Sequence, residues 1–145
     1  MNNVYSLHPE ERQIRNLREE AHDPYHRKLK LSEPTLCPGC GAVYREGRWQ
    51  WGGISREPQT MLCPACMRIQ DESPAGVLVL EGEFLFQHLE EILHVLHNVE
   101  DREKTDHALK RIMAIEEDEE GNLVVSCTDP HLARSLGDAL HHAYK

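Results

Sequence analysis

Apolar residues recur at regular intervals through the second half of the chain, and their spacing predicts an ordered series of elements. Residues 77–80 form a short apolar run that is typical of a buried strand. Residues 83–99 carry a broad apolar face at helical spacing, which predicts an amphipathic helix. Two further strands are predicted at residues 109–115 and 123–127, joined by an acidic turn. The pattern therefore begins β-α-β-β.

A last helix completes this series. Asp129 is a favourable N-cap residue, and Pro130 suits the first helical position that follows it. The apolar stripe of this helix repeats at a spacing of four, at Leu132, Leu136, Leu140 and Tyr144. The order β-α-β-β-α predicts a small α+β sandwich in which two helices cover one face of a sheet.

A different pattern precedes this domain. Residues 42–53 alternate between apolar and polar side chains and predict a β-hairpin that turns at Glu46 and Gly47. The alternation places Trp49 and Trp51 on one face of the hairpin. We favour the interpretation that both indoles fill a small core or pack on the next domain. The alternative is that they stack on the bases of an RNA.

Two cysteine pairs supply the most specific chemistry. Cys37 and Cys40 form one C-x-x-C knuckle, Cys63 and Cys66 form the second, and twenty-two residues separate the two pairs. Four thiolates at this spacing can surround one metal ion, and Zn²⁺ accepts tetrahedral sulfur ligands without redox chemistry. Because sulfur would fill all four positions, we expect one structural zinc ion with no site for a catalytic water.

These patterns divide the chain into three segments. Residues 1–33 have only a thin apolar stripe and predict a flexible or helical basic arm. Residues 34–72 are expected to form a zinc ribbon with four cysteine ligands, too small to fold without the metal. Residues 73–145 form the α+β domain, in which Cys127 is expected to be a small buried hydrophobe.

Charge is distributed unevenly along a chain whose formal net charge is −9. Residues 1–48 hold eight Lys and Arg against seven Asp and Glu, whereas residues 76–145 hold six against fifteen. A uniformly basic nucleic-acid binder is excluded, but the first half can contact phosphate. The cations expected to contact RNA or another partner are Arg12, Arg15, Arg18, Arg27, Lys28, Arg45 and Arg48, with Arg56 and Arg68 as further candidates in the ribbon. Alternatively, the arginines of the arm pair with neighbouring glutamates and remain solvated.

Patterns of enzymes are weak by comparison. The sequence has no nucleophile elbow, phosphate-binding loop or dinucleotide fingerprint. Glu91 and His94 match half of a di-iron motif, but isolated matches of this kind are often accidental. One redox alternative remains, because the Cys37-Pro-Gly-Cys40-Gly knuckle, followed by Tyr44, is similar to that of rubredoxins. We expect a protein that is not an enzyme and has no small-molecule substrate.

The N-terminal residues indicate the compartment. They are polar and charged, without the apolar core of a signal peptide, and no apolar run has the length of a membrane span. We therefore expect a cytoplasmic protein without a membrane partner. In that reducing compartment, paired cysteines bind metal rather than form disulfides.

Residues 34–145 also resemble a known family. The segments that carry the likeness are CPACMR (63–68), PAGVLVLEG (74–82), SCTDPHLAR (126–134) and HHAY (141–144). Their order is similar to that in the large-ribosomal-subunit export adaptors of archaea and eukaryotes, and the chain as a whole resembles small bacterial zinc-ribbon proteins of unassigned function related to them. The resemblance implies a zinc ribbon and an α+β domain that docks on ribosomal RNA or ribosomal protein. Nuclear export is not implied, because the adaptors have additional cysteine pairs.

Two functions follow from these observations. The first is a non-enzymatic zinc-binding protein that associates with RNA or the ribosome, with an affinity that falls steeply as salt rises. The second is a protein–protein adaptor that acts through the acidic α+β domain. It predicts a defined protein partner and no salt-sensitive affinity for RNA.

Overall fold

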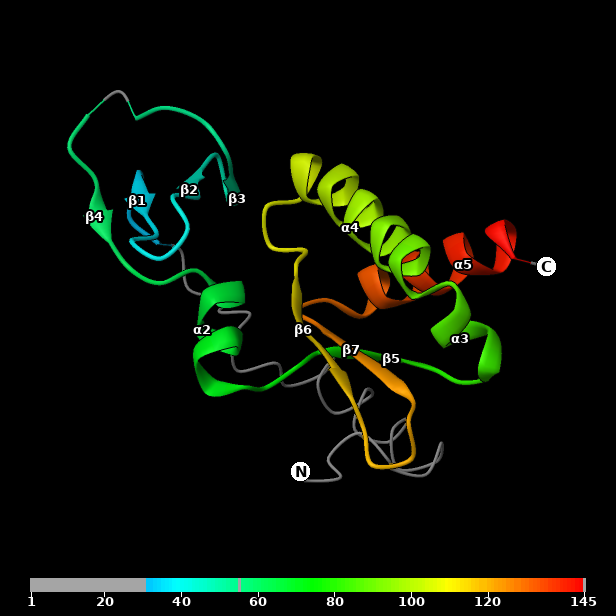
Figure 1. Cartoon of the computed structure of the whole chain (residues 1–145). Helices are drawn as coiled ribbons and strands as arrows, with labels where there is room; N and C mark the ends of the chain where they lie inside the picture. Colours follow the sequence, from blue (N-terminus) through cyan, green and yellow to red (C-terminus); the bar gives the residue numbers. More distant parts are fainter. Residues whose placement is uncertain (1–30, 55, 145) are drawn as a thin grey trace.

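The computed structural model describes residues 31–54 and 56–144 (Figure 1). These residues form a mixed α+β fold with two small sheets and four helices. This confirms the predicted fold class. Of the predicted partner-binding cations, Arg12, Arg15, Arg18, Arg27 and Lys28 lie outside the described residues, so their roles stay predictions.

The ribbon contains the first sheet. Its order is β3-β2-β1-β4, in which β1 and β4 are parallel and the other pairs are antiparallel. The strands are β1 (Thr35–Leu36), β2 (Val43–Arg45), β3 (Arg48–Gln50) and β4 (Gln59–Thr60). Glu46 and Gly47 connect β2 to β3 with φ values of 54° and 79°. Positive φ at both central residues is typical of the tight turns that match strand twist, so the predicted hairpin turn is confirmed.

A short helix that the sequence pattern did not predict follows this sheet. Helix α2 spans Pro64–Asp71 and begins at the second cysteine knuckle, with Pro64 at its first position. Glu72 ends it in the left-handed conformation, at φ 53° and ψ 41°. Its buried residues are Ala65 and Arg68, which is too short a stripe to give a periodic signal.

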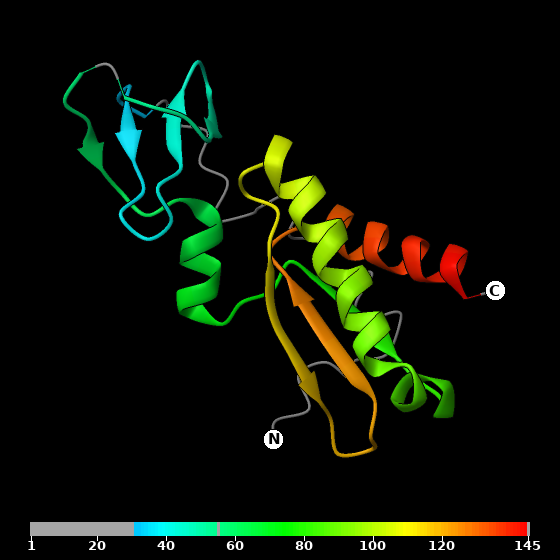
Figure 2. The same cartoon turned by 45° about the horizontal axis from the view of Figure 1, so that its top comes forward.

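The second half forms a three-stranded antiparallel sheet in the order β5-β7-β6. The elements are β5 (Gly76–Leu80), α3 (Glu83–Gln87), α4 (Leu89–Asp106), β6 (Ile112–Glu117), β7 (Leu123–Cys127) and α5 (Pro130–Ala143). Helices α4 and α5 lie on the same side of this sheet (Figure 2). The predicted β-α-β-β-α order is confirmed, apart from a break at His88 that divides the first helix into α3 and α4.

The main core lies between this sheet and its helices. Leu96 of α4 and Leu132 and Leu136 of α5 are fully buried against the inward side chains of β7. Asp129 caps α5 as predicted, because its carboxylate accepts the backbone N–H groups of His131 at 2.7 Å and Leu132 at 3.2 Å. These contacts join the last strand to the last helix in a fixed orientation.

Helix α4 is longer than predicted. The apolar pattern predicts a helix that ends at residue 99, but residues 100–106 continue the helix to Asp106. The last turns of α4 carry no apolar stripe because they contact the ribbon and not the main core. There the Lys104 carbonyl accepts the indole N–H of Trp51 at 2.8 Å. The final carbonyls of a helix have no partner within it, so this bond satisfies one of them. Within the described part of the chain, no helix has the length and hydropathy of a membrane span.

Candidate metal centre

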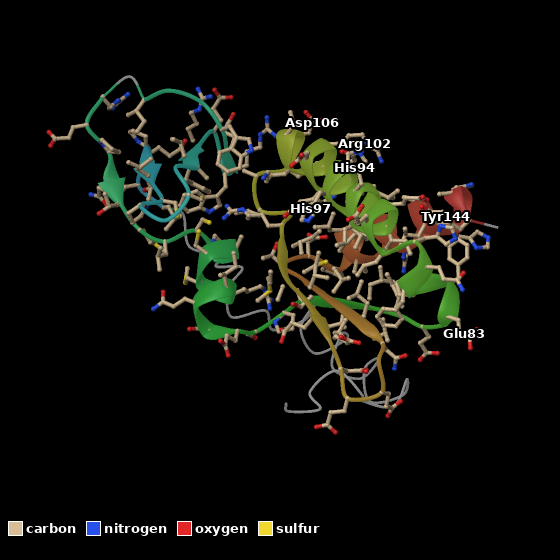
Figure 3. All side chains as sticks on the ribbon, viewed as in Figure 1. Glu83, His94, His97, Arg102, Asp106 and Tyr144 are labelled. Carbon is tan, nitrogen blue, oxygen red and sulfur yellow. The ribbon has the colours of Figure 1, made fainter. Side chains whose placement is uncertain are left out.

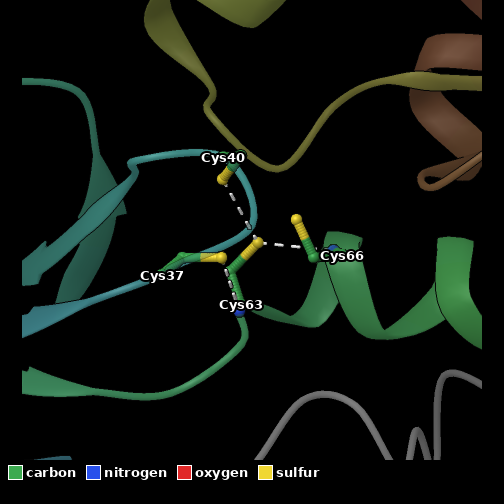
Figure 4. A group of neighbouring side chains, drawn as sticks. All are labelled: Cys37, Cys40, Cys63 and Cys66. Carbon is green, nitrogen blue, oxygen red and sulfur yellow. Dashed lines mark hydrogen bonds between the residues drawn. The ribbon is translucent and has the colours of Figure 1, made fainter.

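Two turns bring the four predicted cysteines together, as Figure 4 shows. Cys37 and Cys40 lie on the connection from β1 to β2, and Cys63 and Cys66 lie at the start of α2. The first turn closes through a hydrogen bond from the Gly41 N–H to the Cys37 carbonyl, and Gly41 has a φ of 85°. Such a φ suits glycine, so Gly41 allows the chain to turn sharply beside the cysteines.

The positions of the sulfurs fit one tetrahedral ion. All four Sγ atoms lie within 4.8 Å of one another, and those of Cys40 and Cys63 are 3.8 Å apart. A metal–sulfur distance of about 2.3 Å gives tetrahedral edges of about 3.8 Å. Among the described residues, this is the group of Cys, His, Asp and Glu that converges closely enough to hold a metal ion. The cluster could therefore hold one metal ion.

Backbone N–H groups point at the sulfurs. The donors are Ala42 to Cys40 at 3.4 Å, Cys63 to Cys37 at 3.3 Å and Cys66 to Cys63 at 3.4 Å. Hydrogen bonds to a charged acceptor stabilise its charged form, so these donors favour thiolates.

Burial opposes that preference, and the balance differs between the ligands. For Cys37, burial raises the pKa of the thiol, but N–H donors from Cys63, Cys40 and Gly39 outweigh it and bring the pKa to about 7. For Cys63 and Cys66, burial dominates and raises the pKa of each thiol above its ordinary value. A thiol that coordinates a metal ion releases its proton to solvent, so a bound cation would reverse this effect.

Gly39 contributes space beside the cluster. A Cβ atom at this residue would lie 3.1 Å from Cys66 Sγ and 3.3 Å from a methyl group of Leu62. The backbone of the first knuckle therefore approaches the second as closely as a glycine permits. The sequence offers the Cys-Pro-Gly-Cys order as a signal, but the contact with Cys66 comes only from the fold.

A cation from the other domain completes the site. Arg111 directly precedes β6, and its guanidinium contacts three of the four sulfurs. Nη2 lies 2.9 Å from Cys40 Sγ and 3.4 Å from Cys63 Sγ, and Nη1 lies 3.2 Å from Cys66 Sγ. No signal in the sequence points to Arg111, because no spacing rule links it to cysteines 45 and 71 positions away.

The two tryptophans have the roles that we favoured. Trp49 is buried in the ribbon core with its ring 5.5 Å from that of Tyr44. Trp51 packs on the next domain, with Lys104 accepting its N–H and the Arg111 guanidinium 5.6 Å from its ring centre. Neither indole is free to act as an exposed base-stacking platform.

The ribbon arginines differ in exposure. Arg48 and Arg56 are exposed, whereas Arg45 folds back along the hairpin, with Nη2 3.5 Å from the Trp51 carbonyl. Arg68 is buried, at 4% exposure, and donates to the Ser73 carbonyl at 3.0 Å. The prediction that Arg68 contacts a partner was therefore wrong, because its guanidinium is hydrogen-bonded to the backbone that follows α2.

Other candidate groups stay apart from the cluster. His94 and His97 come from α4 and are exposed, and His97 faces Glu100 at 3.7 Å (Figure 3). Cys127 is fully buried, and burial, with smaller contributions from Glu100 and Asp129, raises the pKa of its thiol to about 12. It is a core residue and not a fifth ligand.

Comparison of the chain with protein-family models, with curated proteins and with solved structures finds no significant match. The function is therefore inferred from the residues and their geometry.

Proposed function

We propose that the four cysteines hold one structural zinc ion and that the protein is not an enzyme. The geometry of the four sulfurs is the observation that carries this proposal. Tetrahedral sulfur ligands suit zinc, and with four thiolates bound no position is left for water or substrate. The thiolates of Cys37, Cys40, Cys63 and Cys66 would bind the ion, which supplies a cross-link between the two knuckles.

Metal analysis tests this proposal directly. Purified protein is expected to be colourless and to contain one equivalent of zinc per chain. Cys63→Ser should lose the metal, whereas Cys127→Ser should keep it, because Cys127 lies in the core of the α+β domain. A coloured protein that contains iron would instead support the rubredoxin-like alternative.

We further propose that this zinc-stabilised protein associates with RNA, with ribosomal RNA or ribosomal protein as the partner suggested by the resemblance to export adaptors. Arg48 supports this proposal. It is exposed at a cavity of about 360 Å³ that also includes Tyr44, His107 and Lys110. Cations beside an aromatic ring are the combination that single-stranded RNA contacts. The basic residues of the arm would add phosphate contacts.

A lysate gradient and a salt titration test this association. The tagged protein should migrate with a ribosomal subunit at low salt and leave it as salt increases. Arg48→Ala should reduce the slope of log affinity against log salt by about 0.7 for a single-stranded RNA. Arg102→Ala is the matched control, because Arg102 is an exposed arginine on the acidic α4. An unchanged slope for Arg48→Ala would refute the role of Arg48.

A second function is supported by a different surface. Phe84 and Phe86 of α3 are 45% and 48% exposed, and the Phe84 ring lies 5.0 Å from that of Tyr144. Exposed aromatics on an acidic domain are typical of a protein-binding surface. An adaptor that acts through this surface should stay at the top of the gradient at low salt. It should lose its protein partner on Phe86→Ser but not on Arg48→Ala.

A further inference from the structure

Arg111 belongs to one domain by sequence and to the metal centre by its contacts. Its backbone lies in the α+β domain, where its N–H donates to the Thr128 hydroxyl at 2.8 Å and its carbonyl accepts the Thr128 N–H at 2.9 Å. The guanidinium Nε donates to the Ala108 carbonyl at 3.0 Å. These hydrogen bonds fix the position of the Arg111 backbone in the α+β domain and the direction of its side chain.

The far end of the side chain lies on the ribbon. Both terminal nitrogens reach sulfurs, so one guanidinium contacts the Sγ atoms of Cys40, Cys63 and Cys66 at 2.9–3.4 Å. These three sulfurs form one face of the tetrahedron that the four ligands define. A planar fork of donors can make several such bonds at once, which a lysine ammonium group cannot.

Charge explains why a cation is needed there. Four thiolates around a divalent ion leave a net charge of −2, and an uncompensated charge in a largely buried site is costly. Donors to metal-bound ligands typically change metal affinity by 10–100-fold. Among the described residues, Arg111 is the cation whose contacts with the cysteine sulfurs are observed.

The same guanidinium lies on the interface between the two domains. It is 5.6 Å from the centre of the Trp51 ring, and Trp51 donates to the Lys104 carbonyl at the end of α4. Ala108 and Leu109, which precede Arg111, pack into the ribbon core beside Trp49. The segment before β6 passes close to Cys40 and Cys66 in Figure 4.

We infer that Arg111 is the counter-cation of the metal centre and that it couples metal binding to the docking of the α+β domain on the ribbon. The negative charge of the metal-loaded centre attracts the Arg111 guanidinium. The guanidinium in turn packs against the Trp51 ring and keeps the ribbon docked on the α+β domain. Arg111 is thus a positioning residue that acts through the ligands. This inference rests on the proposed metal centre but not on a particular partner.

Three variants test the coupling: Arg111→Met, Arg111→Lys and the control Arg102→Met, which removes an exposed arginine from α4. Zinc affinity is measured by competition with a chromogenic chelator. Docking is measured in the zinc-loaded protein as the hydrogen-exchange protection of the Trp51 indole N–H, assigned by Trp51→Phe. The chain has two tryptophans, so two indole signals are expected.

Arg111→Met should bind zinc 10–100-fold more weakly than the control and lose the protection of Trp51 when the site is saturated. Arg111→Lys restores charge without the fork, so it should recover part of the affinity but not the protection. It is also the variant to use if Arg111→Met does not fold. Affinity of both variants within twofold of the control would overturn the counter-cation role. Protection that persists in both zinc-loaded variants would overturn the coupling. Failure of the wild-type protein to bind zinc would instead refute the proposed zinc centre.

Discussion

A methyl group added at Gly76 tests the closest approach between the sheet and α5. Gly76 begins β5 and pairs with Cys127 of the central strand. Its Cα faces the N-terminal turn of α5, where Asp129 caps the helix. Gly76→Ala introduces no unfavourable φ, since Gly76 does not have a positive φ. A loss of stability would therefore report packing, because the effect of alanine on the unfolded chain has the opposite sign.

The structure supplies the magnitude. A Cβ at this position would lie 2.8 Å from the Cα of Pro130, 3.1 Å from the Asp129 carbonyl oxygen and 3.1 Å from the Cβ of Ala133. None of these atoms can move by a rotamer change, so the N-terminal turn of α5 must shift. Overpacking of a core costs about 1–3 kcal/mol, and rigid neighbours place this case in the upper half of that range.

Gly137→Ala is the matched control, because Gly137 lies in α5, the helix whose first turn Gly76 approaches. There a Cβ would meet only the Cδ1 atom of Leu78, at 3.4 Å, which is the end of a flexible side chain. Alanine is more favourable than glycine inside a helix by about 0.5–1 kcal/mol. The two substitutions add the same methyl group, yet their expected effects on the free energy of unfolding have opposite signs.

Urea unfolding followed by far-ultraviolet circular dichroism measures this difference. With a slope of about 2 kcal/mol per molar urea, a difference of about 3 kcal/mol separates the midpoints of the two variants by about 1.5 M. The wild-type midpoint should fall between them. If Gly76→Ala unfolded at or above the midpoint of Gly137→Ala, the close contact between β5 and the start of α5 would be refuted.

Three further predictions concern the thiols and the metal. Removal of the metal by a chelator should unfold the ribbon and leave the α+β domain folded, because the main core contains no ribbon residue; calorimetry that shows one transition shifting as a whole would contradict this. Zinc affinity should rise with pH, by about tenfold per pH unit for each proton released, because the raised pKa values of Cys63 and Cys66 keep both thiols protonated near neutral pH; a slope of log affinity against pH well below two would be inconsistent. After chelation, an alkylating reagent should modify four cysteines per chain while the α+β domain stays folded. It should spare Cys127, whose thiol is fully buried with a pKa of about 12, and mass spectrometry can count the modified thiols.

Local signals in the sequence were sufficient to predict the order of the strands and the main helices in the α+β domain. The continuous apolar run of residues 123–127 matches β7 because this strand is central and buried on both faces. Asp129 and Pro130 mark the start of α5 through chemistry that is confined to one turn. The four cysteines likewise predict their own convergence, since C-x-x-C spacing and metal geometry are linked.

The interface between the domains could not be predicted in this way. Residues 100–106 are helical because the end of α4 meets Trp51, a contact across 53 residues that leaves no apolar period. The predicted strand at residues 109–115 begins only at Ile112, since the preceding residues pack on the ribbon. From the sequence alone, Arg111 is indistinguishable from an ordinary surface cation, and only the fold brings its guanidinium to the cysteine sulfurs. Long-range contacts of single residues carry no local pattern, and here they decide the site.

The position of the metal centre limits where this protein can act. Sulfur occupies the ligand positions, and Arg111 covers the face formed by Cys40, Cys63 and Cys66, so neither substrate nor partner can reach a bound ion from that side. Under the coupling proposed above, a loaded centre would hold the ribbon and the α+β domain in a fixed relation. Arg48 lies on the ribbon and Phe86 on α3, in different domains. A partner that contacts both surfaces would depend on the Arg111 contact, whereas a partner that uses only one would bind Arg111→Lys and wild-type protein equally well. Partner binding by Arg111→Lys thus separates a composite surface from a single-domain surface.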